Sequence, residues 1–325
     1  KAVQEEDDNN LAGLQAMQAY HFHKRYYGRK YDTYIYRGLY HALSELSGST
    51  YNAIKVQGPA RNRMNSVAVS KRSAQFYAAA ADGRIFLGNY ETQTGKPTGF
   101  ENAYPNRIVA LSNDESYLAN GTDSADVQIF SLLNPKSKPV LVTTLQGATN
   151  DIEFLPDNTG FVVSKTDKSV SVVNHVTGKV ASTKSLPFEL KSLSVSPNGK
   201  QLVGGTWSGE LVMVDLPAMN YRVILKDSSA QILSVRFSPD GKKIAYGTFE
   251  IKAKRGLVKM YDVEKQQKDV RQFSGHKAGV YDVEFSPDGK LLASAGSDKR
   301  LQMWVLENPE DLPIVMDNNN GFIWD

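Results

Sequence analysis

The chain has 325 residues, of which 41% are hydrophobic and 22% are charged, and its formal net charge is +3. This is the composition of an ordinary globular protein, and the charge is too small to indicate nucleic-acid binding, for which a basic stripe or arm is typical. The absence of cysteine excludes disulfides, thiolate chemistry and cysteine-ligated zinc. No apolar stretch is long enough to span a membrane, so we expect no membrane span in this chain.

Residues 1–50 predict a helical hairpin that precedes the main domain. An acidic run at 5–8 suits a helix N-terminus, because the helix dipole favours negative charge there. Leu11, Leu14 and Met17 follow at helical spacing, and Asp32 or Thr33 is placed to cap a second helix. The apolar stripe of that helix consists of Ile35, Leu39, Ala42, Leu43 and Leu46. We expect the hairpin to be a brace packed on the next domain or, alternatively, a joint towards an upstream domain.

From residue 51 the sequence changes to short alternating strands separated by a recurring turn. Ser-Pro-Asp-Gly occurs at 238–241 and 286–289, and variants occur at 196–199, 155–158, 112–115 and 70–73. The second residues of these turns are 71, 113, 156, 197, 239 and 287, so the gaps are 42, 43, 41, 42 and 48. Extra residues around 250–255 account for the long gap. So regular a period predicts structural repeats.

Each repeat has the order expected of one blade of a β-propeller. An apolar strand comes first, the turn follows, and a second strand leads through a tight Gly/Asp turn to a third strand. A more polar outer strand closes the unit. A period of about 40–45 residues with four short strands is typical of such blades. The sequence therefore predicts an all-β propeller over residues 51–325, with six full repeats and the start of a seventh.

The sixth repeat carries a motif that points to a family. Gly275-His276 opens it, Trp304 ends its third strand, and Ser294 and Asp298 lie between them. This repeat closely resembles the WD40 repeat. The resemblance implies that His276, Ser294, Asp298 and Trp304 form a buried, structural hydrogen-bonded chain, because buried polar groups need partners. The other repeats depart from the motif, and the residues at their tryptophan position are Gly88, Phe130, Val173, Val214 and Tyr261.

The number of blades depends on the two ends of the predicted domain. Residues 321–325 resemble the first strand of a further repeat, with Asp325 lying 43 residues after Asp282, and residues 51–57 resemble an outer strand. In WD40 propellers such an N-terminal strand usually completes the last blade, and closing the ring removes the sheet edges. We therefore expect seven blades, the last one incomplete in this chain. The alternative is six blades with the C-terminal tail lying across the ring.

The resemblance implies a function in protein interaction, as a non-catalytic scaffold or sensor module. Loops on a rigid scaffold commonly carry function, and WD40 partners usually dock on the narrow face, where each innermost strand begins. The aligned repeats place the following candidate partner-binding residues on that face: Arg63, Asn65, Arg107, Asn150, Lys191, Trp207, Tyr281, Phe322 and Trp324.

These candidates include a basic arc and an aromatic arc. The basic arc consists of Arg63, Arg107 and Lys191, and the aromatic arc consists of Tyr281, Phe322 and Trp324. Arginine suits carboxylates and phosphates, and aromatic residues anchor interfaces. We therefore expect an acidic or phosphorylated peptide with one apolar anchor, the alternative being ordinary surface variation. The extra residues Lys252–Arg255 are a second candidate contact for an acidic partner or, alternatively, a solvated loop.

We predict no catalytic residue, no metal and no cofactor. The alternative function is a propeller hydrolase or lyase with a metal or substrate in the central channel, because Asp151, Asp282 and Asp325 occupy equivalent positions on the innermost strands. Against this, aspartate at that position often binds the neighbouring backbone in WD40 blades.

The wider context of the chain rests on weaker signals. It begins with Lys1, so we expect it to be cut from a longer, multidomain protein. Its helical segment, from Leu11 to Tyr20 and from Ile35 to Leu43, looks like the joint before the C-terminal WD40 propellers of large bacterial signalling proteins. The lack of cysteine fits the cytoplasm, with the periplasm as the alternative.

Overall fold

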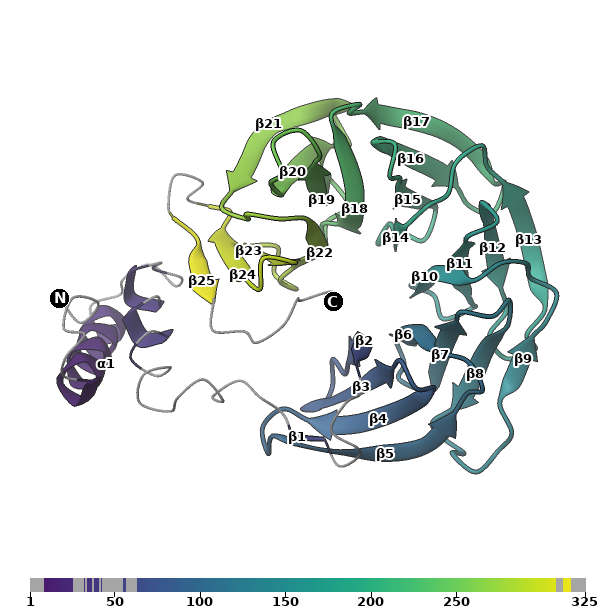
Figure 1. The fold of residues 1–325 in the computed structure, drawn as a ribbon, viewed down its shortest axis with the longest axis horizontal. Coiled ribbons are helices and arrows are strands. Elements are labelled where there is room, and N and C mark those ends of the chain that lie inside the picture. Colours follow the sequence, from purple (N-terminus) through teal and green to yellow (C-terminus); the bar gives the residue numbers. More distant parts are fainter. Residues whose placement is uncertain are drawn as a thin grey trace.

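The computed structural model describes residues 9–25, 32, 34–36, 38–40, 42, 55–56, 63–307 and 312–316. Within these residues, six β-sheets are arranged radially around a common axis, in the manner of propeller blades (Figure 1). In blades two to six, four strands follow one another antiparallel in chain order, and the first strand lies nearest the axis. The prediction of an all-β propeller is therefore confirmed.

The strands of the six blades have the following bounds. Blade one consists of β1 (Lys55–Val56), which pairs in parallel with β5, and of β2 (Met64–Val69), β3 (Gln75–Ala80), β4 (Arg84–Asn89) and β5 (Thr94–Glu101). Blade two consists of β6 (Asn106–Leu111), β7 (Tyr117–Thr122), β8 (Val127–Ser131) and β9 (Val140–Val142). Blade three consists of β10 (Thr149–Phe154), β11 (Phe161–Lys165), β12 (Ser169–Val173) and β13 (Val180–Ser185). Blade four consists of β14 (Ser192–Val195), β15 (Gln201–Gly205), β16 (Glu210–Asp215) and β17 (Asn220–Lys226). Blade five consists of β18 (Ala230–Phe237), β19 (Lys243–Glu250), β20 (Leu257–Asp262) and β21 (Gln267–Ser274). Blade six consists of β22 (Val280–Phe285), β23 (Leu291–Gly296), β24 (Leu301–Val305) and β25 (Ile314–Met316).

The recurring turn owes its shape to hydrogen bonds within a few residues. In blade five, Ser238 Oγ donates to Asp240 Oδ1 at 2.6 Å, and the N–H of Lys243 donates to Ser238 Oγ at 2.9 Å. Gly241 has a φ of 72°, a left-handed conformation that glycine adopts without steric cost. The same side-chain pattern recurs at 112–115, 196–199 and 286–289. Local chemistry thus fixes the turn between the first and second strands.

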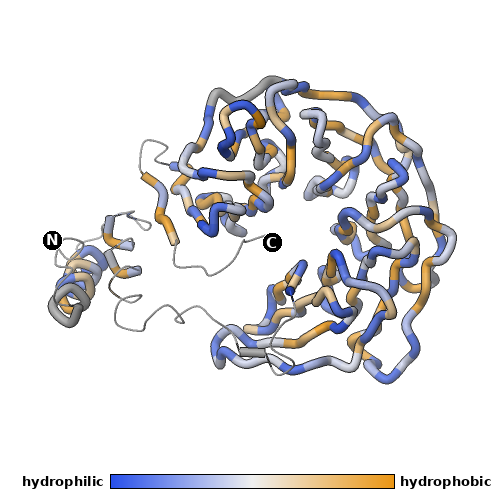
Figure 2. The backbone as a smooth tube through the Cα atoms, viewed as in Figure 1, coloured by the Kyte–Doolittle hydropathy of each residue, from blue (hydrophilic) through white to orange (hydrophobic). Residues whose placement is uncertain are grey.

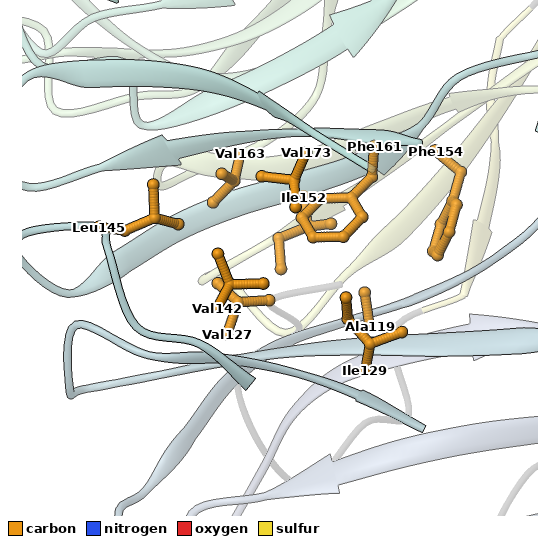
Figure 3. Close-up of a cluster of buried hydrophobic side chains, with 10 residues drawn as sticks. All are labelled: Ala119, Val127, Ile129, Val142, Leu145, Ile152, Phe154, Phe161, Val163 and Val173. Carbon is orange, nitrogen blue, oxygen red and sulfur yellow. The ribbon is translucent and has the colours of Figure 1, made fainter. Parts of the chain in front are cut away.

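The hydrophobic core lies between the blades. Side chains alternate along a strand, so each blade has one face towards the preceding blade and one towards the next. Hydrophobic and hydrophilic stretches accordingly alternate along the chain in Figure 2. Figure 3 shows the interface of blades two and three, where Phe161 and Val163 belong to the same buried cluster as Val127 and Ile129. Because these side chains are at most 1% exposed, each blade depends on its neighbour for burial.

The N-terminal segment is helical wherever the structure describes it as regular. The helix α1 (Asn9–Arg25) lies outside the ring in Figure 1, and helical residues recur at 34–36, 38–40 and 42. Asp32 caps this second helix, because its Oδ1 accepts hydrogen bonds from the N–H groups of Tyr34 and Ile35, both at 3.1 Å.

The two helical stretches meet through an aromatic contact. The rings of Tyr20 and Tyr36 meet edge-on, with their centroids 6.3 Å apart. Leu14 and Met17, which recur at helical spacing in the sequence, are exposed on α1. The acidic run at 5–8 and the connection at 27–30 lie outside the described residues.

No helix in the described part of the chain is long and apolar enough to cross a membrane.

The described structure has six blades, whereas the sequence predicts seven. Residues 321–325, on which the prediction of a seventh blade rests, lie outside the described residues. Each blade packs on the next from one to six, but no comparable packing joins blade six to blade one among the described residues. Figure 1 shows the ring open on that side.

Apolar side chains at core positions are exposed on both flanks of the opening. Val67, the third residue from the end of β2, is 37% exposed, whereas the same position in the first strands of the other five blades is at most 4% exposed. Leu301, three residues before Trp304, is partly exposed, whereas its five equivalents are fully buried. Within the described residues, both flanks therefore expose apolar side chains at positions that are buried in the other blades.

Truncation of Phe161 to alanine should test the dependence of each blade on its neighbour. The phenyl side chain of Phe161 fills the interface of blades two and three, so its loss should lower the free energy of unfolding by about 3–5 kcal/mol. Leu133→Ala, at a side chain that is 78% exposed, should change it by less than about 0.5 kcal/mol. Urea unfolding followed by circular dichroism measures both, and equal effects would contradict burial between blades.

Candidate functional site

A buried polar chain ties blade six together. His276 Nδ1 lies 2.9 Å from Asp298 Oδ1, and His276 Nε2 lies 2.7 Å from Ser294 Oγ. The ring of Trp304 meets the His276 ring edge-on, with centroids 6.3 Å apart. Burial lowers the pKa of His276, although the nearby Asp298 raises it. The four residues singled out in the sequence thus lie together, and their arrangement is that of a structural support.

Blade five has an ionic arrangement in the corresponding region. The ammonium group of Lys259, which is buried, lies 2.9 Å from Asp227 Oδ2 and 3.3 Å from Glu250 Oε1. The group of Lys259, Asp227 and Glu250 is not among the site residues predicted from the sequence. A signal for it exists in the repeat alignment, because Lys259 precedes Tyr261 by two residues just as the buried Gln302 precedes Trp304.

Those candidate partner-binding residues that the structure describes lie at the edge where the first strands begin and where second strands turn into third strands; we call this edge the top face. Three of their side chains bind the backbone of the next blade. Asn65 Nδ2 donates to Asn106 O at 2.6 Å, and Arg107 Nη1 donates to Thr149 O at 3.0 Å. Asn150 Nδ2 donates in the same way to the carbonyl of Leu190 at 3.0 Å. These three side chains therefore join neighbouring blades at the top face.

The hydrogen bonds continue from Asn150 to an exposed tryptophan in blade four. Asn150 Nδ2 also donates to Glu189 Oε1 at 2.9 Å, and the same carboxylate binds the ammonium group of Lys191. That ammonium group lies 4.1 Å from the centroid of the Trp207 ring, a cation–π contact. Trp207 itself is 57% exposed. The top face thus holds a large aromatic surface in a fixed place.

Comparison with known proteins agrees with this architecture. Residues 267–305, which include the polar chain of blade six, match the family "WD domain, G-beta repeat". The chain is 25% identical over 70% of its length to actin-interacting protein 1 of Drosophila melanogaster, of which the match covers 37%. It is 28% identical over 50% of its length to WD repeat-containing protein AAC3 of Dictyostelium discoideum, covering 34% of that protein. It is also 24% identical over 61% of its length to the serine-threonine kinase receptor-associated protein of Mus musculus, covering 54% of it.

The chain is a WD40-repeat β-propeller. It matches about a third to a half of the length of these three relatives, all of which are eukaryotic. The likeness of the helical segment to a joint in bacterial signalling proteins finds no support among them and stays a prediction.

The candidate residues Arg63 and Tyr281 belong to blades one and six, whereas the hydrogen-bonded set around Asn150 and Trp207 belongs to blades three and four. Arg63 is exposed just before β2, and Tyr281 is half-buried on β22. Phe322 and Trp324 lie outside the described residues, so the aromatic arc is described only at Tyr281. In the basic arc, Arg107 Nε lies 2.8 Å from Asp123 Oδ1, and Lys191 binds Glu189. Arg107 and Lys191 therefore already have a carboxylate partner.

Asp151, one of the three aspartates that the sequence placed at equivalent positions of the innermost strands, binds backbone, whereas Asp325 lies outside the described residues. Asp151 Oδ1 accepts a hydrogen bond from Ile152 N, and its Oδ2 accepts one from Leu193 N of the next blade, both at 2.8 Å. Ser192 Oγ accepts the corresponding bond from Val235 N at 3.2 Å. Within the described residues, no group of three potential ligands is placed to hold a metal ion. Asp151 thus binds the neighbouring backbone, which is the role that the sequence analysis set against metal binding.

One arginine crosses this channel. Arg236 Nη1 of blade five donates to Glu153 Oε2 of blade three at 3.4 Å, and Arg236 Nε lies 2.8 Å from Glu284 Oε2 of blade six. Glu153 Oε2 also accepts a hydrogen bond from Val195 N at 3.1 Å. Burial raises the pKa of Glu153 to about 7, while Arg236 opposes that change.

Replacement of His276 by glutamine should remove a pH-dependent contribution to stability. The variant should lose about 1–3 kcal/mol near neutral pH, because Ser294 and Asp298 lose a buried partner. The folded-state pKa of His276 is depressed, so below about 6.5 the unfolded state binds a proton that the native state does not. The stability of the wild type therefore falls there, and its advantage over His276→Gln should shrink. Urea unfolding across the pH range measures this gap, and a gap that widens towards acid would contradict the assignment.

Proposed function

We propose that this propeller is a non-catalytic scaffold that holds a protein or peptide on its top face. The observation that carries the proposal is Trp207, a large aromatic side chain that is exposed and yet fixed by Lys191 and Glu189. Tryptophan, tyrosine and arginine dominate the binding energy of protein interfaces. The names of two relatives support an interaction role, since they describe an actin-interacting and a receptor-associated protein.

The proposed partner is a segment with carboxylate or phosphate groups and one apolar anchor. Arg107 and Lys191 face the surface but bind Asp123 and Glu189. An anionic partner would compete with these carboxylates, which favours groups that carry more charge or that bind arginine through two oxygens. Arg63, Asn65 and Asn150 would line the same face, with Tyr281, Phe322 and Trp324 as the proposed aromatic side.

Affinity capture should test the scaffold. Proteins retained by the wild type should be lost from Trp207→Ala, because loss of a central aromatic anchor costs about 2 kcal/mol or more, roughly a thirtyfold loss of affinity. Tyr221→Ala, at an exposed aromatic residue on the outer strand β17, should retain them. The proposal fails if the partners stay bound to Trp207→Ala, or if both variants lose them equally while remaining folded.

We also propose that a seventh sheet closes the ring, with 321–325 as its innermost strand. The exposure of Val67 and Leu301 at positions that are buried in every other blade supports this. A seventh sheet would pack its two faces on these two flanks, as each blade of a propeller packs between its neighbours.

The lack of cysteine makes the closure testable by thiol labelling. A single cysteine in place of Leu301 should react with a maleimide at least about tenfold more slowly than one in place of Leu133, because a covering sheet limits access. The exposed Leu133 sets the unprotected rate. Equal rates in the two folded variants would show an open flank and would exclude the seventh sheet.

A further inference from the structure

The turn between β19 and β20 is longer than its counterparts and is held as a hairpin. It has six residues, 251–256, between the two strands, whereas the equivalent turns of blades four and six have four each, 206–209 and 297–300. The N–H of Glu250 donates to Arg255 O at 2.9 Å, and Arg255 Nε lies 2.8 Å from Glu250 Oε2. The backbone and the side chains of these two residues thus close the base of the hairpin.

The tip of this hairpin is apolar and basic. Ile251 is 56% exposed, and Lys252 and Lys254 are exposed beside it. Neither lysine has an ion-pair partner in the part of the chain that the structure describes. The nearest acidic residue in sequence is Glu250, whose carboxylate already binds Arg255 and Lys259. The tip therefore presents uncompensated positive charge next to an apolar side chain.

The base of the hairpin is anchored in the buried ion group of blade five. Glu250 and Asp227 both bind Lys259, which is only 4% exposed. Although burial raises it, hydrogen bonds from Ser229 and Lys259 lower the pKa of Asp227 to about 2. Both carboxylates are thus charged at neutral pH and bound to protein cations, which leaves the charge of the tip unbalanced.

The same group connects the hairpin to the turn that carries Trp207. The N–H of Asp227 donates to Gly209 O at 2.7 Å, and the N–H of Ile232 donates to Thr206 O at 2.9 Å. These two bonds join the Trp207 turn of blade four to the loop before β18 and to β18 itself. Trp207 and Ile251, on equivalent turns of adjacent blades, are therefore held by one continuous set of hydrogen bonds and ion pairs.

We propose that the 251–254 tip and Trp207 form one docking edge for an acidic peptide with apolar side chains. The inference rests on the proposed scaffold function and narrows it to blades four and five. Two uncompensated lysines match carboxylates, and two exposed apolar side chains match apolar anchors. Two lysines are too few for a nucleic acid, for which a basic stripe along a face is typical.

The test uses short fluorescent peptides of defined chemistry. One peptide alternates leucine and glutamate, a second replaces each glutamate by lysine, and a third replaces each leucine by alanine. We expect the first to bind the wild type at least about tenfold more tightly than either of the others. Fluorescence anisotropy measures the three affinities. Equal binding of all three would overturn the proposal.

A charge-reversed variant locates the site. Lys252→Glu/Lys254→Glu should weaken the leucine–glutamate peptide at least about tenfold, and Ile251→Ser should weaken it as well. The matched control is Lys136→Glu/Lys138→Glu, which has the same charge change and spacing in an exposed loop between β8 and β9. This control should bind as the wild type does. Equal losses in both charge-reversed variants would show unspecific attraction and would contradict the docking edge.

Two further outcomes separate this inference from the scaffold proposal. If Trp207→Ala loses natural partners while Lys252→Glu/Lys254→Glu binds the acidic peptide normally, the scaffold stands and the docking edge falls. If vesicles of anionic phospholipid bind the tip more tightly than the peptide, the partner is a membrane surface and the proposal is wrong.

Discussion

The structure depends on one constraint, which is that a twisted four-stranded sheet cannot bury both of its faces alone. Each blade has apolar side chains on both sides, and they become buried only where the neighbouring blade stacks against them, as Phe161 does against Val127 and Ile129. The polar contacts obey the same rule, because Asn65, Arg107 and Asn150 each bind the backbone of the following blade. The side chains at the top face are therefore held in place by contacts between neighbouring blades. A binding site there is as rigid as the blade interface beneath it.

Features that depend on residues close in sequence could be predicted. The Ser-Pro-Asp-Gly turn forms because its own serine, aspartate and glycine supply the bonds and the left-handed backbone, and the partners of His276 all lie within one repeat. Contacts across repeats were missed. Arg236 meets Glu153 two repeats earlier in the chain, and Asn150 of blade three donates to the carboxylate of Glu189 just before blade four. Such pairs depend on how strands face each other across the ring, which periodicity alone does not state. Asp32 caps a helical stretch as the sequence indicates, but the exposed Leu14 and Met17 show that helical spacing does not determine which face is buried.

The blades also show that one structural requirement admits several chemical solutions. Blade six fills the region near its top face with Ser294, His276 and Asp298, whereas blade five has a buried lysine between two carboxylates. Blade two uses amides, since Asn102 and Asn120 both donate to Asn106 Oδ1, at 2.7 and 2.8 Å. In each case buried polar groups bind one another, as they must when water is excluded. The family motif is therefore visible in one repeat although related supports recur in others.

Arg236 has a mechanical consequence for the six blades that the structure describes. Within the described residues blade six does not pack on blade one, so this row of blades resists sliding but can still spread apart. Arg236 in blade five forms ion pairs with Glu153 in blade three and with Glu284 in blade six. It therefore connects three blades on the inner side of the ring. Spreading would lengthen and break both ion pairs of Arg236. The curvature of this half of the molecule is thus maintained from the inside, independently of whatever covers its ends.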